Sequence, residues 1–316
     1  MSTRWDETSV PALGGRTALV TGANAGLGLA ASKVFARHGA RVLLACRNPT
    51  KAAAAALEVT AEVTGEGSVD VVDLDLANLA SVAAAARAVR DTEPRLDLLV
   101  NNAGLMAIDQ ATTVDGFEMQ LGVNHLAHFA LTAQLAPLLN ATAGARVVNV
   151  SSMGHRAGQL HLDDLFFEKR GYDRWRPYFQ SKLCNLLFTA ELQRRLTQAR
   201  VGTLALTAHP GASHTDLGFE GSGLTNKLFQ PFVALAQPAW LGALPIVRAA
   251  TDAAAVGGQF YGPRWVVRGY PQVEKPSRRA RNATDARLLW DRSEALTGIT
   301  FDVAATGDAS GSAEAG

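Results

Sequence analysis

The chain has 316 residues, of which 47% are hydrophobic and 19% are charged, a composition typical of a globular protein with a sizeable core. Its 30 Lys and Arg nearly balance its 29 Asp and Glu, so the net charge of +1 provides no overall basic field for nucleic acid, and no nucleic-acid partner is expected. Two cysteines, Cys46 and Cys184, are too few for a disulfide-rich secreted scaffold or a four-ligand zinc site, and they favour a reducing, cytoplasmic location.

The two ends of the chain differ from the part between them. Residues 1–14 contain no apolar run, so we expect an N-terminal tail that is neither a signal peptide nor a membrane anchor. Residues 304–316 are rich in Gly, Ala, Ser and acidic residues, which predicts a disordered C-terminal tail. Residues 15–303 contain no linker and no repeat, which predicts one domain.

Within 15–303, short apolar runs alternate with longer Ala- and Leu-rich stretches, the pattern of repeated βαβ units. The expected strands are 17–21, 41–46, 69–74, 98–101, 146–151, 202–207 and 259–261. The expected helices include 27–38, 52–63, 79–92, 117–139 and 178–197. Several strands are nearly unbroken apolar runs, as expected when helices cover both faces of a sheet. The sequence therefore predicts a single Rossmann-type, doubly wound α/β domain with a seven-stranded, mostly parallel sheet.

A glycine-rich turn directly follows the first expected strand. Glycines there permit positive φ and let backbone N–H groups approach a pyrophosphate, while the helix that follows adds partial positive charge. We expect Gly22, Asn24, Gly26, Leu27 and Gly28 to form this cradle. The spacing G-x-x-x-G-x-G differs from the usual dinucleotide fingerprint and from the P-loop, so a tight turn that only packs helix against strand is the alternative.

Arg47 follows the second expected strand, at the position that distinguishes the two nicotinamide dinucleotides. An acidic residue there would hold the ribose 2′-OH of NAD, but residues 45–47 contain no carboxylate. A guanidinium suits a 2′-phosphate, so the sequence predicts that NADP(H) is preferred, with NAD(H) as the second choice. A solvated surface arginine is the alternative.

Tyr178 and Lys182 lie four residues apart at the start of an expected helix, and therefore share one face. A nearby ammonium favours the phenolate and lowers a pKa that is ordinarily about 10, so we expect Tyr178 to exchange protons. The pattern Y-x-x-x-K also occurs as a surface pair, and its context decides between the two. That context is a set of polar motifs, most of which follow the expected strands at the edge where α/β sheets bind ligands.

With these motifs the sequence resembles the classical short-chain dehydrogenase/reductase (SDR) family, and more closely its retinol-dehydrogenase-like members, over roughly residues 14–300. The motifs are T-G-x-x-x-G-L-G at 21–28, N-N-A-G at 101–104, N-H-L-x-H-F at 124–129, V-N-V-S-S at 148–152, Y-x-x-x-K at 178–182, and H-P-G at 209–211 with Thr215. Ser152 and Tyr178 are 26 positions apart, about twice the separation in many classical members, and the retinol-dehydrogenase-like group carries a similar insertion at 155–177.

The resemblance implies a role for each matching residue. Tyr178 would be the general acid/base, and Lys182 would lower its pKa and hold the nicotinamide ribose. Ser152 would orient the substrate carbonyl beside Tyr178, with Ser151 as the alternative, and Asn124 would support a water that links Lys182 to solvent. The implied cofactor-binding residues are Gly22, Asn24, Gly26, Leu27, Gly28, Arg47, Asp75, Leu76, Asn101, Ala103, Gly104, Tyr178, Lys182, Pro210, Gly211 and Thr215. Among them, Asp75, Leu76 and Asn101 would line the adenosine side. No metal is required.

Residues 212–247 would form a mobile substrate lid, and their apolar content predicts a hydrophobic alcohol or carbonyl substrate. Three prolines within 228–247 argue against a membrane span; peripheral membrane contact and plain core packing are the alternatives. Several histidines lie near the motifs without a metal-ligand spacing, so we expect satisfied or solvent-facing rings, with His155 and His214 as candidates for substrate contact.

The predicted function is NADP(H)-dependent interconversion of an apolar alcohol and its aldehyde or ketone. The alternative is a catalytically silent NADP(H)-binding sensor or scaffold, which the presence of Ser152, Tyr178 and Lys182 disfavours. Because SDR enzymes are often dimers or tetramers, we expect a homo-oligomer.

Overall fold

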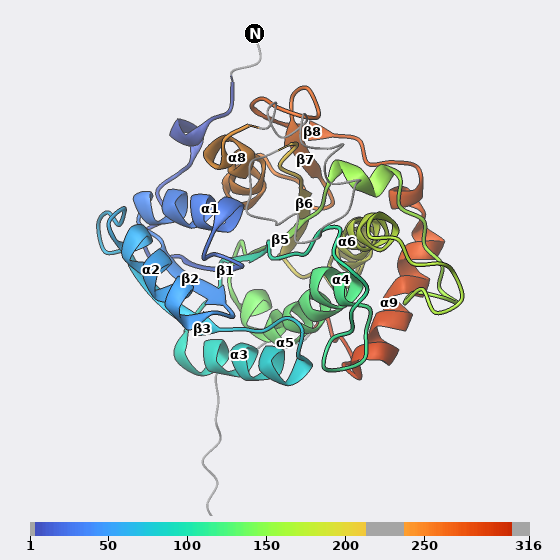
Figure 1. Ribbon diagram of the computed structural model, residues 1–316. Helices are drawn as coiled ribbons and strands as arrows, with labels where there is room; N and C mark the ends of the chain where they lie inside the picture. Colours follow the sequence, from blue (N-terminus) through green and yellow to red (C-terminus); the bar gives the residue numbers. More distant parts are fainter. Residues whose placement is uncertain (1–3, 213–236, 305–316) are drawn as a thin grey trace, which may run out of the picture.

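The computed structural model describes residues 4–212 and 237–304. In this part, one sheet of eight strands in the order β3-β2-β1-β4-β5-β6-β7-β8 lies between two groups of helices (Figure 1). The first seven strands are parallel, and β8 runs antiparallel to β7. The strands are β1 (Thr17–Thr21), β2 (Arg41–Cys46), β3 (Ser68–Asp73), β4 (Leu98–Asn101), β5 (Arg146–Val150), β6 (Leu204–Ala208), β7 (Phe260–Pro263) and β8 (Pro271–Glu274). The α-helices are α1 (Gly26–Arg37), α2 (Pro49–Thr60), α3 (Leu79–Thr92), α4 (Met119–Leu121), α5 (Ala127–Ala141), α6 (Trp175–Gln198), α8 (Ala239–Thr251) and α9 (Ala283–Thr297).

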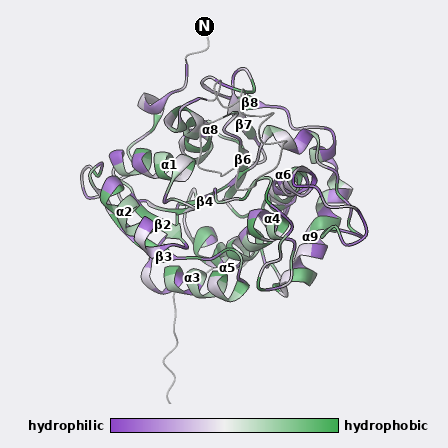
Figure 2. Cartoon of the chain, viewed as in Figure 1, coloured by the Kyte–Doolittle hydropathy of each residue, from purple (hydrophilic) through white to green (hydrophobic). Residues whose placement is uncertain are grey.

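Apolar side chains fill both faces of the sheet, which explains why the strands are nearly continuous hydrophobic runs. On one face α1, α2 and α8 bury residues such as Phe35 and Ile246. On the other face α3, α5, α6 and α9 pack, and the rings of Phe129, Phe188 and Trp290 lie with centroids 5.2 to 5.9 Å apart. Figure 2 shows hydrophobic residues in the sheet and its adjoining helices, and hydrophilic segments along the outer loops.

The strand order reverses at β1, which lies between β2 and β4. Val20 of β1 is in register with Leu44 on one side and Val100 on the other. Connections leaving in opposite directions open a crevice at the carboxyl ends of such strands, which is where α/β sheets bind ligands. The glycine-rich turn after Thr21 therefore stands at the switch point of the sheet.

The seven predicted strands are present, with ends shifted by at most two residues. The eighth strand, β8, was not predicted because it is four residues long, begins with a proline and leaves Val273 47% exposed. Such a segment lacks the apolar signal of a buried strand, and an edge position tolerates its proline. The predicted helix 117–139 also differs, because a five-residue π-helix, Gly122–Leu126, separates α4 from α5.

The N-terminal segment 4–14, which the sequence predicts as a tail, packs on the domain instead. Val10 and Leu13 are buried in the same cluster as α1 and α8, and the Leu13 N–H donates to the carbonyl of His38 at 2.7 Å. The few apolar residues of this short segment have no helical or strand periodicity, so their burial could not be predicted from the sequence. The predicted C-terminal tail lies beyond the described residues except for Ala304.

Most of the predicted lid, including His214 and Thr215, lies outside the described residues. Its last part, 239–247, belongs to α8, where Ala243, Ile246 and Val247 are buried against the core. Residues 239–247 therefore pack in the core, which was the alternative to a substrate lid. No helix among residues 4–212 and 237–304 is both long and apolar enough to cross a bilayer.

Candidate active site

The turn between β1 and α1 has the conformation that its glycines predict. Gly22 and Gly26 have φ values of +65° and +55°. A Cβ on Gly28 would lie 2.4 Å from the carbonyl oxygen of Gly22, so close packing also requires glycine here. The N-cap residue Ala25 provides no side-chain hydrogen bond, and the first turn of α1 has no acidic residue. The N–H groups at the start of α1 therefore face the switch point without a side-chain cap, an arrangement that suits an anion.

A buried threonine and histidine connect this turn to the N-N-A-G segment. The Thr21 hydroxyl accepts from the N–H groups of Asn102 and Ala103 at 2.9 and 3.0 Å, and its distance to His128 Nε2 is 2.9 Å. His128 Nδ1 lies 3.2 Å from the carbonyl oxygen of Asn124, which can only accept, so Nδ1 carries the proton and Nε2 accepts from Thr21. Burial lowers the pKa of His128 to about 4, consistent with a neutral ring. The sequence analysis missed this bridge, although Thr21 and His128 both belong to motifs that it singled out.

Arg47 and Asp75 meet beyond the end of β2. The Arg47 side chain is 73% exposed, and its Nη1 lies 4.0 Å from Asp75 Oδ1. Leu76, the residue after Asp75, is buried, with an exposed fraction of 8%. The buried amide of Asn101 donates to side chains inside the fold, Thr132 Oγ1 at 3.0 Å and Asn149 Oδ1 at 2.8 Å. Its side chain is therefore engaged within the sheet, and its place beside the cofactor stays a prediction.

The π-helix places Asn124 against the N-N-A-G turn. Asn124 Oδ1 accepts from the Leu105 N–H at 2.7 Å, and its Nδ2 donates to the Leu105 carbonyl at 3.0 Å and to Ser181 Oγ at 2.9 Å. A Cβ on Gly104 would lie 3.0 Å from Asn124 Oδ1 and 3.2 Å from Lys182 Nζ, so glycine lets this turn approach both. A π-turn inside a helix is often found at a functional site. Here it aligns Asn124 with α6.

Ser152, Tyr178 and Lys182 lie together at the carboxyl end of β5. The Ser152 side chain is near enough to the Tyr178 phenol to lower its pKa, and Tyr178 is 7% exposed. Lys182 Nζ lies 5.8 Å from the centre of the Tyr178 ring and donates to the Val150 carbonyl at 3.2 Å. The hydroxyl of Ser151 instead donates to the backbone carbonyl of Lys182 at 2.7 Å. The geometry therefore places Ser152, and not Ser151, beside the phenol.

The electrostatics of this group differ from the prediction. Burial raises the pKa of Tyr178 above its ordinary value, and the hydrogen bond with Ser152 opposes that rise. Burial also lowers the pKa of Lys182 to about 8. The predicted lowering of the Tyr178 pKa by Lys182 is therefore absent, because desolvation disfavours both the phenolate and the ammonium.

The Pro210–Gly211 loop is held by residues that the sequence analysis did not identify. Gly211 has φ +69°, and a Cβ there would lie 2.4 Å from the carbonyl oxygen of Val267. Gln237 Nε2 donates to the Pro210 carbonyl at 2.7 Å. His209 Nδ1 accepts from the Gly211 N–H at 3.2 Å, and its Nε2 lies 3.3 Å from Glu274 Oε1 on β8. The unpredicted strand thus places a buried carboxylate beside His209.

His155 supports the site from behind. Its Nδ1 donates to the Ser152 carbonyl at 2.7 Å, and its Nε2 accepts from the Ser277 N–H at 3.3 Å. Burial lowers the pKa of His155 to about 4. Because both ring nitrogens are bound by backbone groups, His155 positions Ser152 and is not free for the substrate contact that we considered. In the described part of the chain, no three His, Cys, Asp or Glu side chains are grouped so that they could hold a metal ion.

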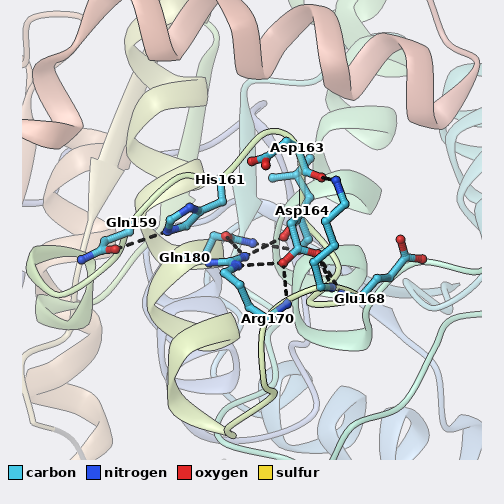
Figure 3. Close-up of polar contacts among 9 residues, drawn as sticks. Gln159, His161, Asp163, Asp164, Glu168, Arg170 and Gln180 are labelled. Atoms are coloured by element: carbon cyan, nitrogen blue, oxygen red, sulfur yellow. Dashed lines mark hydrogen bonds and ion pairs between the residues drawn. The ribbon is translucent and has the colours of Figure 1, made fainter.

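The insert before Tyr178 is organised around Asp164 (Figure 3). Its carboxylate accepts from the N–H groups of Glu168, Lys169 and Arg170 at 2.8 to 3.1 Å and from Arg170 Nε at 2.8 Å. These bonds hold the pKa of Asp164 well below its ordinary range, with the Arg170 side chain as the largest cause. Gln180 Nε2 donates to the carbonyl of Leu165 at 2.9 Å, which attaches the insert to α6 two residues from Tyr178.

Replacing Asp164 with Ala is expected to loosen the insert without unfolding the domain. The amides of residues 168–170 would lose their acceptor and exchange hydrogen faster, which mass spectrometry of exchanged peptides would measure. The matched control is Asp163→Ala, because the exposed Asp163 uses only its backbone carbonyl, which accepts from Lys169 Nζ at 3.1 Å. Equal exchange in the two variants would contradict this role for Asp164.

Comparison with known proteins agrees with this geometry. The family model for short chain dehydrogenases matches residues 16–220. Retinol dehydrogenase 13 of Homo sapiens is 40% identical over 292 residues, which cover 90% of this chain and 85% of that protein. Retinol dehydrogenase 11 of Mus musculus is 40% identical over 297 residues, which cover 93% and 90%.

Solved structures show the same relationship. An uncharacterized protein from Mycobacterium paratuberculosis matches with a TM-score of 0.79 and 42% identity, over 95% of this chain and 100% of that one. A protein assigned as an NAD(P)-dependent gluconate 5-dehydrogenase from Beutenbergia cavernae, solved with bound NADP, matches with a TM-score of 0.63 and 28% identity, over 79% and 96%.

These matches extend over most of the chain and agree with the doubly wound fold. The protein is an oxidoreductase that acts on CH–OH groups and interconverts alcohols and carbonyls. It belongs to the short-chain dehydrogenase/reductase family, whose members bind NAD or NADP, and within that family to the retinol-dehydrogenase-like subgroup.

Proposed function

We propose that this protein is an NADP(H)-dependent oxidoreductase of apolar alcohols and their aldehydes or ketones, with Tyr178 as the general acid/base. The observation that carries the proposal is the grouping of the buried Tyr178 with Ser152, whose side chain lowers the pKa of the phenol, and with Lys182, one helical turn away on α6. This group lies at the strand ends beside the glycine-rich turn, where a dinucleotide and a carbonyl can meet.

Tyr178 and Ser152 have different roles at the substrate oxygen. When bound, the nicotinamide supplies or accepts the hydride, and the side chains handle the proton and the developing charge. In reduction Tyr178 donates its proton to the forming alkoxide, and Ser152 donates a hydrogen bond to the same oxygen. Because burial raises the pKa of Tyr178 above its ordinary value, the phenol is protonated at neutral pH, which is the form that donates the proton in reduction.

Four features of the chain support a bound dinucleotide. The start of α1 lacks a side-chain cap and would receive the pyrophosphate. Arg47 is exposed at the end of β2 and would pair with a 2′-phosphate. The Pro210–Gly211 loop and Lys182 would hold the nicotinamide half. The bound NADP in the gluconate 5-dehydrogenase structure is consistent with this preference.

Two observations support an apolar substrate. The relatives that match over most of the chain are retinol dehydrogenases, named for an apolar alcohol. In addition, Tyr178 is flanked by aromatic rings, with the centroid of Trp175 at 6.2 Å and that of Phe179 at 5.9 Å. Aromatic walls favour hydrophobic ligands.

The cofactor part is tested by thermal melts of the full chain with NADPH and with NADH, since a ligand that binds only the native state raises Tm according to its affinity. We expect a larger shift with NADPH. Arg47→Ala should remove most of the difference, about tenfold or more in affinity, because a charge-assisted hydrogen bond contributes roughly 1.5–3 kcal/mol. The matched control is Arg87→Ala, another exposed arginine, on α3.

Two outcomes would overturn the cofactor proposal. Equal shifts with both nucleotides would remove the preference for NADP(H). A cooperative melt that neither nucleotide moves would show that the glycine-rich turn does not hold a dinucleotide in this protein.

A further inference from the structure

The turn between β7 and β8 presents apolar side chains to solvent. Trp265, Val266 and Val267 are 66%, 37% and 44% exposed, and Arg264 and Arg268 flank them in the sequence. We refer to residues 264–268 as the β7–β8 tip. Val266 has φ +63°, a left-handed conformation that β-branched residues rarely adopt. The chain therefore keeps an apolar side chain at the tip despite a conformational cost, a feature associated with functional surfaces.

The tip is attached to the loop that carries Pro210 and Gly211. The Val267 carbonyl accepts from the Ala212 N–H at 2.8 Å, and the Gly269 N–H donates to Gln237 Oε1 at 3.0 Å. Gln237 directly precedes α8, which lies beside β7 and β8 in Figure 1. Trp240, in the first turn of α8, is a second exposed tryptophan at 54%. Two large aromatic side chains are thus exposed near one edge of the candidate active site.

The same part of the chain is strongly basic. Residues 264–281 contain six Lys or Arg and one acid, Glu274, although the whole chain has a net charge of only +1. No acid occurs in residues 263–273, and the Glu274 side chain is only 7% exposed. Among the described residues no acidic side chain pairs with Arg264 or Arg268, and the Arg264 guanidinium lies 5.9 Å from the centre of the Trp265 ring. Within residues 4–212 and 237–304, the positive charge of the tip is therefore not neutralised by an ion pair.

We propose that the β7–β8 tip, together with Trp240, docks the protein on an anionic lipid membrane. Tryptophan is enriched at the boundary between headgroups and acyl chains, and Arg side chains are attracted to anionic headgroups. In a two-fold contact centred on the tip, a second copy of this chain would bring the same positive charges against it. A single-stranded nucleic acid would use the arginines and stack a base on Trp265, but it would leave the exposed Val266 and Val267 without a role. A bilayer is the partner that satisfies both the charges and the apolar side chains.

Docking through this surface would bring the Pro210–Gly211 edge close to the bilayer, where apolar alcohols and aldehydes concentrate. Only this use of the membrane rests on the proposed function. The docking itself is independent of catalysis, so it is tested without cofactor or substrate. Failure of the membrane proposal and failure of the proposed reaction are therefore distinguishable.

The test is flotation of the purified full chain with two kinds of vesicle, one of phosphatidylcholine alone and one with about a third phosphatidylglycerol. We expect binding to the anionic vesicles at low salt and release at high salt, because screening weakens the attraction. Neutralising the arginines with Arg264→Gln and Arg268→Gln should lower vesicle partitioning about tenfold or more. Trp265→Ser with Val267→Ser should lower it comparably by removing the apolar contact.

Matched controls carry the same chemical changes at sites away from the tip. Leu57→Ser with Val114→Ser removes two side chains that are 75% and 77% exposed, and Arg87→Gln with Arg287→Gln removes two exposed charges on α3 and α9. Both should bind vesicles like the wild type. Because all the changed side chains are at the surface, Tm verifies that each variant is folded.

Three results would overturn the proposal. The wild type could fail to float with anionic vesicles at low salt, or the tip variants could float as well as the controls. The third is binding of a single-stranded oligonucleotide that depends on Arg264 and Arg268 without any vesicle binding, which would identify a polyanion contact in place of a membrane.

Discussion

Tyr178→Phe should lower kcat for carbonyl reduction by roughly 10²–10⁴-fold, because the substitution removes the hydroxyl that donates the proton to the alkoxide in the proposed mechanism. The ring remains, so the packing against Trp175 and Phe179 is kept. Binding of NADPH should be unchanged within experimental error, and Tm should change little. The measurement is steady-state reduction of a panel of apolar aldehydes with NADPH, alongside a melt titration with NADPH.

The matched control is Tyr172→Phe, the same chemical change elsewhere on the insert. The Tyr172 hydroxyl donates to the Ile108 carbonyl at 3.2 Å, so its loss affects stability but should leave kcat close to that of the wild type. If Tyr178→Phe kept full activity while the wild type responded normally to NADPH, Tyr178 would not be the proton donor. If both variants lost activity equally, the loss would reflect the fold and not the phenol.

Lys182→Met should make the cofactor-free protein more stable at neutral pH while abolishing most of its activity. Burial lowers the pKa of Lys182 from its ordinary 10.5 to about 8, so the folded state carries a charge that it disfavours. Each pKa unit corresponds to about 1.4 kcal/mol, which makes the gain at most about 3.5 kcal/mol. The Val150 carbonyl would keep its hydrogen bond from Asn185 Nδ2 at 3.1 Å, so the change leaves no orphaned acceptor.

The sign of the effect gives a second test. Below pH 8 Lys182 is protonated in both the folded and the unfolded chain, so the full cost of burying the ammonium applies and the variant gains most. Between pH 8 and 10.5 the folded wild type has already lost its proton while the unfolded chain keeps it, so wild-type stability rises with pH relative to the variant. Denaturant unfolding at several pH values should therefore show the advantage of Lys182→Met shrinking above pH 8.

The control for this prediction is Lys33→Met, which removes a lysine paired with Glu58 at the surface. Surface pairs contribute about 0–1 kcal/mol, so this variant should be near neutral or slightly destabilised at every pH. A Lys182→Met variant that is less stable than the wild type at pH 7 would show that the lysine stabilises the empty fold. A gain in stability that did not vary with pH would show that packing, and not charge, is its cause.

Most of the sheet could be predicted because strands covered on both faces must be apolar throughout, and glycine and polar motifs mark their ends. The same motifs identified Ser152, Tyr178 and Lys182, whose chemistry is unusual enough to stand out in the chain, and the structure brings their side chains together. Asn101 shows the limit of a motif. The residue matches the family pattern, but the motif does not predict that its side-chain amide donates hydrogen bonds to Thr132 and Asn149 inside the fold. Arg47 and Asp75 were expected near the adenosine. That their side chains lie 4.0 Å apart could be learned only from the structure.

The sequence by itself determined the class of fold, the glycine-rich turn at the switch point and the group of residues proposed to carry the chemistry, because each depends on local pattern or on residue type. Only the tertiary structure decided the place of β8, the His209–Glu274 contact, the support of Ser152 by His155 and the exposed tip between β7 and β8. These depend on contacts between residues far apart in the chain, which no local pattern encodes. The direction of the Tyr178 pKa shift belongs with them, because burial, a property of the whole fold, outweighs the nearby lysine that the sequence shows.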